Sequence, residues 1–325
     1  MQELLNIMLD SGRTGVELSL YIILPIMVIM MAIMHVLDKK NILNWVAKGF
    51  SPLLILFGLP GLGVFAIIQI LFISFAAPVS TLKIMEHDES ISDAGIAATL
   101  AAILVMAQAN AVFPLAAVGL NVPVGIATSL IGGLIASFIA FKLSGGHTSI
   151  KTTSHEPIEP IEPIEPIEPT EPIKQEAKTK KLVPLLFEGG EAGLAIVLKS
   201  IPPLIIAIFM VNLFKRYGVI DFLEVILSPA LTLIGIPTVA VLPIVTKFIA
   251  GGTAMMAIIL DLMNEGAMSV ADLNRIAGFT LNPLDPVGLA VLMATGSRVT
   301  KVAKPAIIAA IIGIVIRGIL HLIIF

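Results

Sequence analysis

Two stretches of this sequence, MLDSGRTGVELSLYIILP at residues 8–25 and LFEGGEAGLAIVLKSIPP at residues 186–203, resemble each other position by position. The matched positions pair Asp10 with Glu188, Gly12 with Gly190, Gly15 with Gly193, and Pro25 with Pro203. Leucine matches are expected in any apolar chain, but a shared helix breaker implies a shared bend. These matches therefore indicate an internal duplication.

The composition places the duplicated unit in a membrane. Hydrophobic residues make up 57% of the chain, charged residues make up 13%, and the mean hydropathy is +1.01. An ordinary soluble domain is about half apolar and about a quarter charged. Residues 18–37, 122–141 and 305–325 form nearly uninterrupted apolar runs, and a helix needs about 20 such residues to cross a bilayer. The sequence therefore predicts an all-α, polytopic membrane protein.

Further matches set the boundaries of the two repeats. Ser51-Pro52 and Gly58-Leu59-Pro60 match Ser228-Pro229 and Gly235-Ile236-Pro237 at nearly the same offset along the chain. Between the repeats, residues 156–173 read as successive Glu-Pro-Ile or Glu-Pro-Thr triplets, which favour an extended polyproline-like form. We therefore expect a first membrane repeat at residues 1–143, a linker at 144–181 and a second repeat at 182–325. The linker is interpreted as a stiff spacer, with a docking peptide for a proline-reading partner as the alternative.

Each half also contains two interruptions of its apolar runs. Ala76-Ala77-Pro78 and Gly251-Gly252-Thr253 break one run, and a later segment carries Gln108 and Asn110 in the first half and Asn282-Pro283-Leu284-Asp285-Pro286 in the second. A broken helix survives in hydrocarbon only when it is buried in protein or lines a wet cavity. Corresponding breaks in two repeats point to a solute site near the middle of the membrane. The alternatives are close helix packing for the small residues and a surface loop for residues 282–286.

The distribution of Lys and Arg tests the topology, because cytoplasmic loops collect basic residues. We expect three crossings in each half, with the segment around Gln108 in the first half and the segment around Asp285 in the second half each entering and leaving the membrane on one side as a re-entrant hairpin. One face then collects Lys39, Lys40, Lys48, Lys142, Lys151, Lys174, Lys178, Lys180, Lys181, Arg275, Arg298, Lys301 and Lys304, and the other keeps Arg13, Lys83, Lys215, Arg216 and Arg317. An odd number of crossings makes the repeats inverted, with a cytoplasmic linker and a location in the inner cell membrane. The sequence leaves open whether residues 41–57 and 218–235 cross the membrane.

Several polar residues inside apolar runs are candidates for solute binding. Lys247 needs a compensating partner in the membrane, and Asp285 and Asp261 are the candidates, with snorkelling of the lysine as the alternative. Asp285 could also accept hydrogen bonds from a solute or bind a coupling cation, while Gln108 and Asn110 can donate and accept. The predicted solute-binding residues are Gln69, Ala77, Pro78, Gln108, Asn110, Lys247, Gly251, Gly252, Thr253, Asn282 and Asp285.

Other functional classes find little support in the residues. The chain has no cysteine, which excludes disulfides and thiolate metal sites, and its histidines lack metal-ligand spacing. No phosphate-binding loop and no Ser/His/Asp set is present, so we expect neither ATP-driven transport nor an enzyme. A net charge of −3 gives no reason to expect nucleic acid as a partner. We therefore expect no cofactor and no metal site, with sodium ions or protons as candidate coupling ions.

The residues also resemble a known family. The helix start at Glu188-Gly189-Gly190-Glu191-Ala192-Gly193 and the stretch Phe248-Ile249-Ala250-Gly251-Gly252-Thr253-Ala254 look like the nucleoside-recognition, or Gate, domain family, which includes the spore maturation proteins A and B and is distantly similar to concentrative nucleoside transporters. The resemblance implies hairpins and broken helices meeting at a central site. It favours a secondary transporter for a nucleoside or another small polar metabolite, with a non-transporting membrane assembly protein as the alternative. The lipid bilayer and the solute are the expected partners, and a homo-oligomer stays open.

Overall fold

The computed structural model describes residues 2–40, 42, 54, 56–75, 77–146 and 182–325. The predicted proline-rich spacer and the Ser51-Pro52 stretch therefore lie outside the described residues. Every regular element within the described ranges is a helix, which confirms the all-α prediction. Among the described residues, five helical segments are long and apolar enough to cross a membrane, namely Gln2–Lys39, Asp93–Ala116, Val122–Leu143, Leu182–Arg216 and Ala303–Ile324. The chain is a multi-pass membrane protein.

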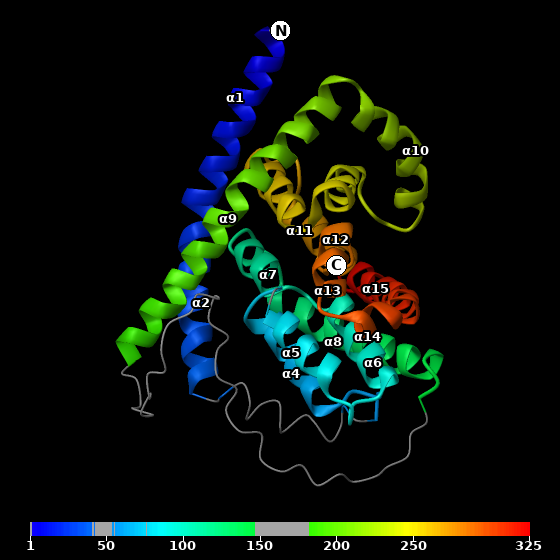
Figure 1. The fold of residues 1–325 in the computed structure, drawn as a ribbon. Coiled ribbons are helices and arrows are strands. Elements are labelled where there is room, and N and C mark those ends of the chain that lie inside the picture. Colours follow the sequence, from blue (N-terminus) through cyan, green and yellow to red (C-terminus); the bar gives the residue numbers. More distant parts are fainter. Residues whose placement is uncertain (1, 41, 43–53, 55, 76, 147–181) are drawn as a thin grey trace.

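The two halves present similar series of helices (Figure 1). The first half contains α1 (Gln2–Glu17), a π-helical turn η1 (Leu18–Ile23), α2 (Leu24–Lys39), α4 (Gly61–Phe72), α5 (Ala77–His87), α6 (Asp93–Val105), α7 (Ala109–Ala116) and α8 (Val122–Leu143). The second half contains α9 (Leu182–Arg216), α10 (Val219–Leu233), a 3-10 turn η2 (Thr238–Ala240), α11 (Val241–Asn264), α12 (Val270–Thr280), α13 (Pro286–Met293), α14 (Ser297–Lys301) and α15 (Ala303–Ile324). Matching serine caps, Ser92 before α6 and Ser269 before α12, start corresponding helices of the two halves.

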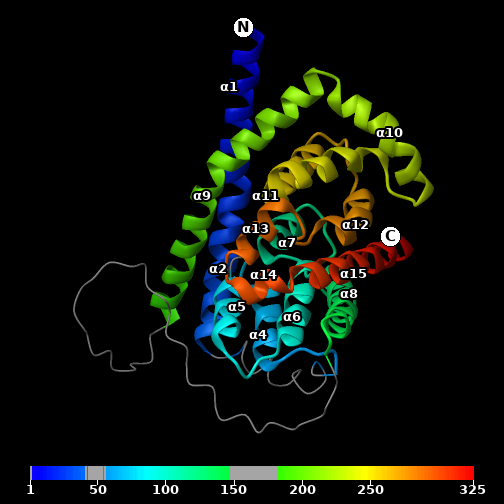
Figure 2. The same ribbon diagram turned by 45° about the vertical axis from the view of Figure 1, so that its right-hand side comes forward.

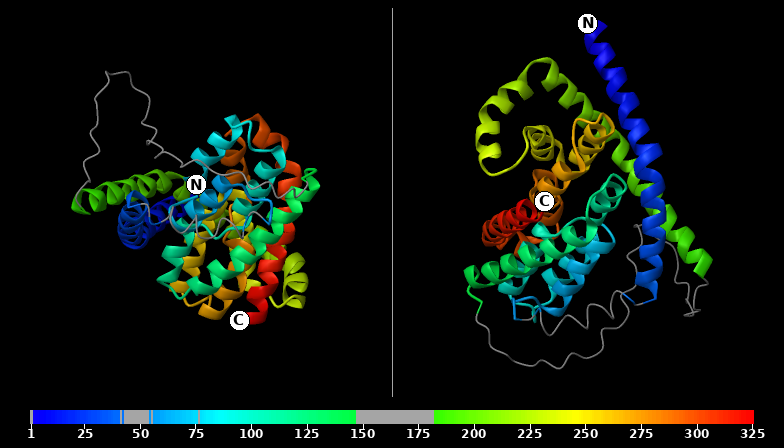
Figure 3. Two further views of the ribbon diagram at one scale, coloured as in Figure 1. Left: turned by 90° about the horizontal axis from the view of Figure 1, so that it is seen from below. Right: turned by 180° about the vertical axis from the view of Figure 1, so that it is seen from behind.

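The duplicated stretches pack against each other in opposite directions. The rod formed by α1, η1 and α2 lies beside α9 along one side of the molecule in all views (Figures 1 and 3). A methyl group placed on Gly15 would lie 2.7 Å from Ile205 Cγ1, and one placed on Gly193 would lie 2.7 Å from the Met27 carbonyl oxygen. The alignment of the two stretches pairs Gly15 with Gly193 and, continued along the chain, Met27 with Ile205. The two contacts therefore exchange with each other when the two halves are exchanged, as an approximate two-fold axis requires.

A second contact between the halves repeats this relationship. Helices α8 and α15 cross where Gly132 and Gly313 face each other. A methyl group on Gly132 would lie 2.6 Å from the Gly313 carbonyl oxygen, and one on Gly313 would lie 2.5 Å from the Gly132 carbonyl oxygen. Away from this crossing, Thr128 on α8 contacts His321 on α15, so the residue numbers run in opposite directions. Both contacts therefore have the antiparallel geometry of inverted repeats.

The re-entrant hairpin lies in a different segment from the predicted one. Thr81 Oγ1 on α5 donates a 2.7 Å hydrogen bond to Gln69 Oε1 on α4. A straight helix over this stretch would separate these side chains by about 18 Å, so the chain must reverse between Phe72 and Ala77. The prediction that the segment around Gln108 forms the hairpin is wrong, because α6 and α7 together form one interrupted span. Hydropathy alone does not show whether an apolar segment crosses the membrane or reverses within it.

The second half contains a matching break in α11. Gly251 has φ +84° and ψ 176°, which interrupts the helix at the predicted Gly-Gly-Thr stretch. Helix α10 has 15 residues, which is shorter than a helical span, and it arcs away from the bundle beyond the end of α9 (Figure 2). Its exposed Val225 and Leu233 suit contact with lipid. This geometry favours the surface interpretation of residues 218–235.

Candidate functional site

A buried ion pair lies at the centre of the second half. Lys247 Nζ on the first part of α11 is 3.2 Å from Asp285 Oδ2, and it also donates a 2.5 Å hydrogen bond to the Asn282 carbonyl oxygen. The two residues are only 2% and 4% exposed. Asp285, rather than Asp261, is therefore the partner that Lys247 requires, and snorkelling does not describe this lysine.

Residues 282–285 form a buried turn between α12 and α13. Asp285 precedes α13 and accepts a 2.8 Å hydrogen bond from the Gly288 N–H through Oδ1, so one carboxylate caps a helix and binds a lysine. Asn282 Oδ1 accepts from the Leu284 N–H at 3.1 Å, and Asn282 Nδ2 donates to the Phe279 carbonyl oxygen at 2.8 Å. Asn282 and Asp285 are buried, so the surface-loop alternative for this stretch is wrong.

The break in α11 lies between polar groups from both halves. A methyl group on Gly252 would lie 3.4 Å from Gln108 Nε2 and 3.8 Å from Asp285 Oδ2, and one on Gly251 would lie 3.6 Å from Asp285 Oδ1. Gln108 is buried and precedes α7, as Asp285 precedes α13. The structure thus brings together six of the predicted residues, namely Gln108, Lys247, Gly251, Gly252, Asn282 and Asp285.

The remaining predicted residues lie around the hairpin and its neighbours. Gln69 accepts the bond from Thr81 inside the hairpin, and Asn110 Oδ1 accepts a 3.3 Å hydrogen bond from the Phe75 N–H at the hairpin turn. Ala77 and Pro78 form the first turn of α5, where a proline costs no helical hydrogen bond. These contacts hold the turn in place and do not reach the Lys247–Asp285 pair through any hydrogen bond among the described residues.

A small cavity joins Asn110 to Thr253. Its volume is about 20 Å³, and Ser19 on η1 and residues of α9 close its other side. This volume accommodates about one water molecule, whereas small-molecule sites usually measure about 300–1,000 Å³. The Ser19 hydroxyl is buried there without a hydrogen-bond partner among the described residues. Ser19 is not among the solute-binding residues predicted from the sequence, although this serine interrupts the apolar run at residues 18–37.

Arg317 is a second site residue that sequence reasoning missed. This arginine on α15 is fully buried, and its Nη1 donates hydrogen bonds to the Val105 carbonyl oxygen at 3.0 Å and to the Leu281 carbonyl oxygen at 2.7 Å. These carbonyls lie where α6 and α12 end, one in each half. Arg317 was counted among the few basic residues of the outer face, although it interrupts the apolar run at residues 305–325, and a charge inside such a run was the signal that could have found it.

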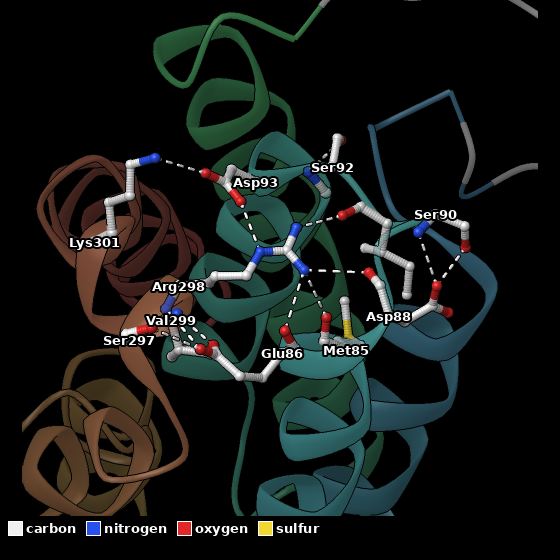
Figure 4. A network of polar contacts seen from close by, with 12 residues as sticks. Met85, Glu86, Asp88, Ser90, Ser92, Asp93, Ser297, Arg298, Val299 and Lys301 are labelled. Carbon is white, nitrogen blue, oxygen red and sulfur yellow. Dashed lines mark hydrogen bonds and ion pairs between the residues drawn. The ribbon is translucent and has the colours of Figure 1, made fainter.

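A polar network at the ends of several helices links the two halves at α14 (Figure 4). Arg298 donates to Asp93 Oδ1 at 3.0 Å. It also donates to four backbone carbonyl oxygens, those of Met85, Glu86, Asp88 and Ile91. In return, Glu86 accepts from the N–H groups of Arg298 and Val299 at 2.8 and 3.0 Å. Partial burial acts to raise the pKa of Glu86, but these N–H groups and Ser297 outweigh it, so the pKa lies below the usual value. A guanidinium thus caps the end of α5 while a carboxylate caps the start of α14.

The fold is also that of known transporters. The inward-facing, substrate-bound structure of the nucleoside transporter CNTnw matches with a TM-score of 0.67 at 16% sequence identity, over 92% of this chain and 73% of that chain. An outward-facing variant matches with a TM-score of 0.66 at 16% identity over 93% and 74%, and an intermediate state with 0.68 at 14% over 92% and 74%. No protein-family model and no curated protein matches the sequence. At this identity the comparison establishes the fold.

Proposed function

We propose that the protein is a secondary transporter that moves a nucleoside or another small polar metabolite by alternating access. The observation that carries the proposal is the burial of Lys247, Asp285 and Gln108 together at helix breaks of two antiparallel halves. Removing charges from water is costly, so ionisable groups within a membrane protein usually serve a function. The matching fold of a transporter solved in inward-facing and outward-facing states supports the same conclusion.

Each site residue has a distinct proposed role. Asp285 accepts hydrogen bonds from solute hydroxyl groups, and Gln108, which lies beside the same Gly252, donates and accepts. Lys247 and Asn282 orient Asp285 and its turn, and the lack of a side chain at Gly251 and Gly252 leaves room for the solute. The hydrogen-bonded residues Gln69 and Asn110, with Ala77 and Pro78, hold the hairpin turn. Because the cavity beside Thr253 holds about 20 Å³, solute entry requires α7 and α11 to move away from η1 and α9.

Moving the re-entrant hairpin to residues 61–87 leaves the proposed orientation of the protein in the membrane unchanged. With residues 61–87 re-entrant, Lys83 joins the basic face and Arg275 leaves it, so the imbalance of basic residues is the same. Arg275 Nε binds the Phe325 carbonyl oxygen at 3.1 Å, which fits a shared outer face. We therefore assign residues 144–181 to the cytoplasm as a linker between two membrane repeats, and both ends of the chain to the outer face of the inner cell membrane. A reporter fused after Phe325 and found in the cytoplasm would contradict this orientation.

Counterflow in proteoliposomes tests transport directly. Vesicles holding the purified chain and an unlabelled nucleoside are diluted into the labelled nucleoside, with amino acids and sugars as further solutes. We expect accumulation about tenfold above protein-free vesicles for at least one solute. Asp285→Asn should reduce it by about tenfold, since an amide cannot replace a carboxylate acceptor that is also paired with Lys247. Lys83→Gln, on the exposed face of α5, is the matched control and should transport normally.

The alternative remains a non-transporting assembly protein of the spore-maturation type. It predicts no counterflow with any solute and no rise in melting temperature when nucleosides are added to the detergent-solubilised protein. That combined result would overturn the transport proposal.

A further inference from the structure

Carbonyl groups at the helix breaks bring partial negative charge into the interior of this protein. A helix that ends inside the membrane leaves backbone carbonyls without helical partners, and its end carries about half a negative charge. In transporters with broken helices, such carbonyls often coordinate the coupling cation. The carbonyl oxygens at the ends of α6 and α12 therefore need hydrogen-bond donors or cations from elsewhere in the protein.

One guanidinium binds a carbonyl group at the end of each of the two helices. Val105 is the last residue of α6, and Leu281 directly follows α12. Both carbonyl oxygens accept from Arg317 Nη1, at 3.0 and 2.7 Å. Two helix ends of about half a negative charge each match the single positive charge of Arg317, which is fully buried. The guanidinium therefore places a positive charge against both helix ends through Nη1, while its Nε and Nη2 are buried without a hydrogen-bond partner among the described residues.

The next carbonyl along the chain binds a second fixed cation. Asn282 directly follows Leu281, and its carbonyl oxygen accepts from Lys247 Nζ at 2.5 Å. The same ammonium group contacts Asp285 Oδ2 at 3.2 Å. A carbonyl oxygen and a carboxylate are the ligands that a hard cation such as sodium prefers. Here a lysine occupies the position between them.

We propose that Arg317 and Lys247 take the place of a coupling metal cation at the helix breaks, so that solute movement requires no sodium ion. This inference rests on the proposed transport function and concerns only how transport is driven. In this arrangement Arg317 is a positioning residue that fixes the ends of α6 and α12, and Lys247 positions the carboxylate of Asp285.

The first test measures sodium binding by the wild-type protein without any solute. Melting temperatures are compared in about 100 mM sodium chloride, potassium chloride and choline chloride, because an ion that binds only the folded state raises the melting temperature. We expect values within about 1 °C of one another. A sodium-specific rise of about 3 °C or more, as a millimolar site would give, would overturn the inference.

The second test measures counterflow of labelled uridine in the same three salts. We expect initial rates within about twofold of one another. Counterflow that falls about tenfold without sodium would contradict this inference and leave the transport proposal intact. Counterflow absent in every salt and for every solute would contradict the transport proposal, while the melting experiment would still report on sodium binding.

Substitutions of Arg317 provide a readout that a merely structural role would not change. Arg317→Met removes the charge and exposes both carbonyls, so sodium should raise the melting temperature of this variant more than that of the wild type. Arg317→Lys is the matched control, because both carbonyls contact the same nitrogen and one ammonium group has three donors. It should show the salt response of the wild type. Equal salt responses in all three proteins would overturn the role of Arg317, and if Arg317→Met does not fold, the wild-type comparison decides.

Discussion

Gln108 and Asp285 occupy the same position in the two halves and meet at the same glycine. The alignment that pairs the two halves matches these residues, and each directly precedes a short second helix, α7 or α13. A methyl group on Gly252 would contact both side chains, at 3.4 Å from Gln108 Nε2 and 3.8 Å from Asp285 Oδ2. The backbones of the two breaks correspond, but one contributes a neutral amide and the other a carboxylate. The duplicated frame therefore encloses a site that is asymmetric in charge.

Removing Asp285 alone should destabilise the protein more than removing it together with Lys247. Asp285→Leu leaves the buried ammonium group without its counter-ion, which costs about 3–5 kcal/mol, whereas Lys247→Met with Asp285→Leu removes both charges. Scanning fluorimetry in detergent should show a lower melting temperature for the single variant. Counterflow should be lost in both. A double variant that melts below the single one would contradict the importance of this ion pair.

Alanine at Gly251 should impair transport as well as folding. Its φ of +84° strains any other residue by about 1–2 kcal/mol, and the new methyl group would lie 3.3 Å from Val287 Cγ2 and near Asp285. Gly266 is the matched control, since its φ is +70° and nothing lies within 4 Å of an added methyl group. Both alanine variants should melt at lower temperatures, but only Gly251→Ala should slow counterflow. Equal rates in the two variants would place Gly251 away from the solute path.

Alanine at Gly132 or Gly313 should separate α8 from α15. Each new methyl group would lie within about 2.6 Å of a backbone oxygen on the opposite helix, and such overpacking typically costs about 1–3 kcal/mol. Gly125 lies on the same helix α8 with no atom within 4 Å of an added methyl group. Gly125→Ala should therefore be neutral or stabilising by up to about 1 kcal/mol. Thermal unfolding of the three variants measures this difference.

Cysteine cross-linking should detect the antiparallel packing of α1 and α9. The chain has no native cysteine, and Asn212 Nδ2 lies 3.0 Å from Ser11 Oγ. Ser11→Cys combined with Asn212→Cys should form an oxidant-dependent cross-link within one chain, visible by mobility on a denaturing gel after cleavage in the linker. Ser11→Cys with Glu191→Cys is the control, because only parallel repeats would bring these positions together. A cross-link in the control pair alone would contradict the inverted arrangement.

Acid should weaken the contact between α5 and α14 through Glu86. Its pKa lies below the usual value in the folded protein, so this carboxylate stabilises the fold at pH values above its unfolded pKa of about 4.5, and the contribution is lost as the pH falls through the lower folded pKa. Melting temperatures between about pH 6 and pH 3 should fall more steeply for the wild type than for Glu86→Gln. The same pH dependence in both proteins would mean that the hydrogen bonds from the N–H groups of Arg298 and Val299 are no stronger to the charged carboxylate than to the amide.

Much of the fold was predictable from the pattern of breakers in an apolar chain. The duplication, the helical class and the breaks near Pro78, Gly251 and Asp285 follow from local composition, because proline, glycine and buried polar groups interrupt a membrane helix wherever they occur. The need of Lys247 for an acidic partner follows from the cost of an unpaired charge in the membrane. These inferences need no knowledge of which helices touch.

Tertiary structure determined the direction of the segments and the identity of the partners. The bond between Gln69 and Thr81 shows which segment reverses, and it depends on two side chains that sequence alone does not bring together. The same holds for the choice of Asp285 over Asp261, and for Arg317, whose two carbonyl partners lie on distant helices. Local sequence determines where a membrane helix must break, because each backbone N–H and C=O group of a helix forms its hydrogen bond with a residue only a few positions away along the chain. The group that satisfies a broken end is determined only when distant helices pack, because its distance and burial depend on every element around it.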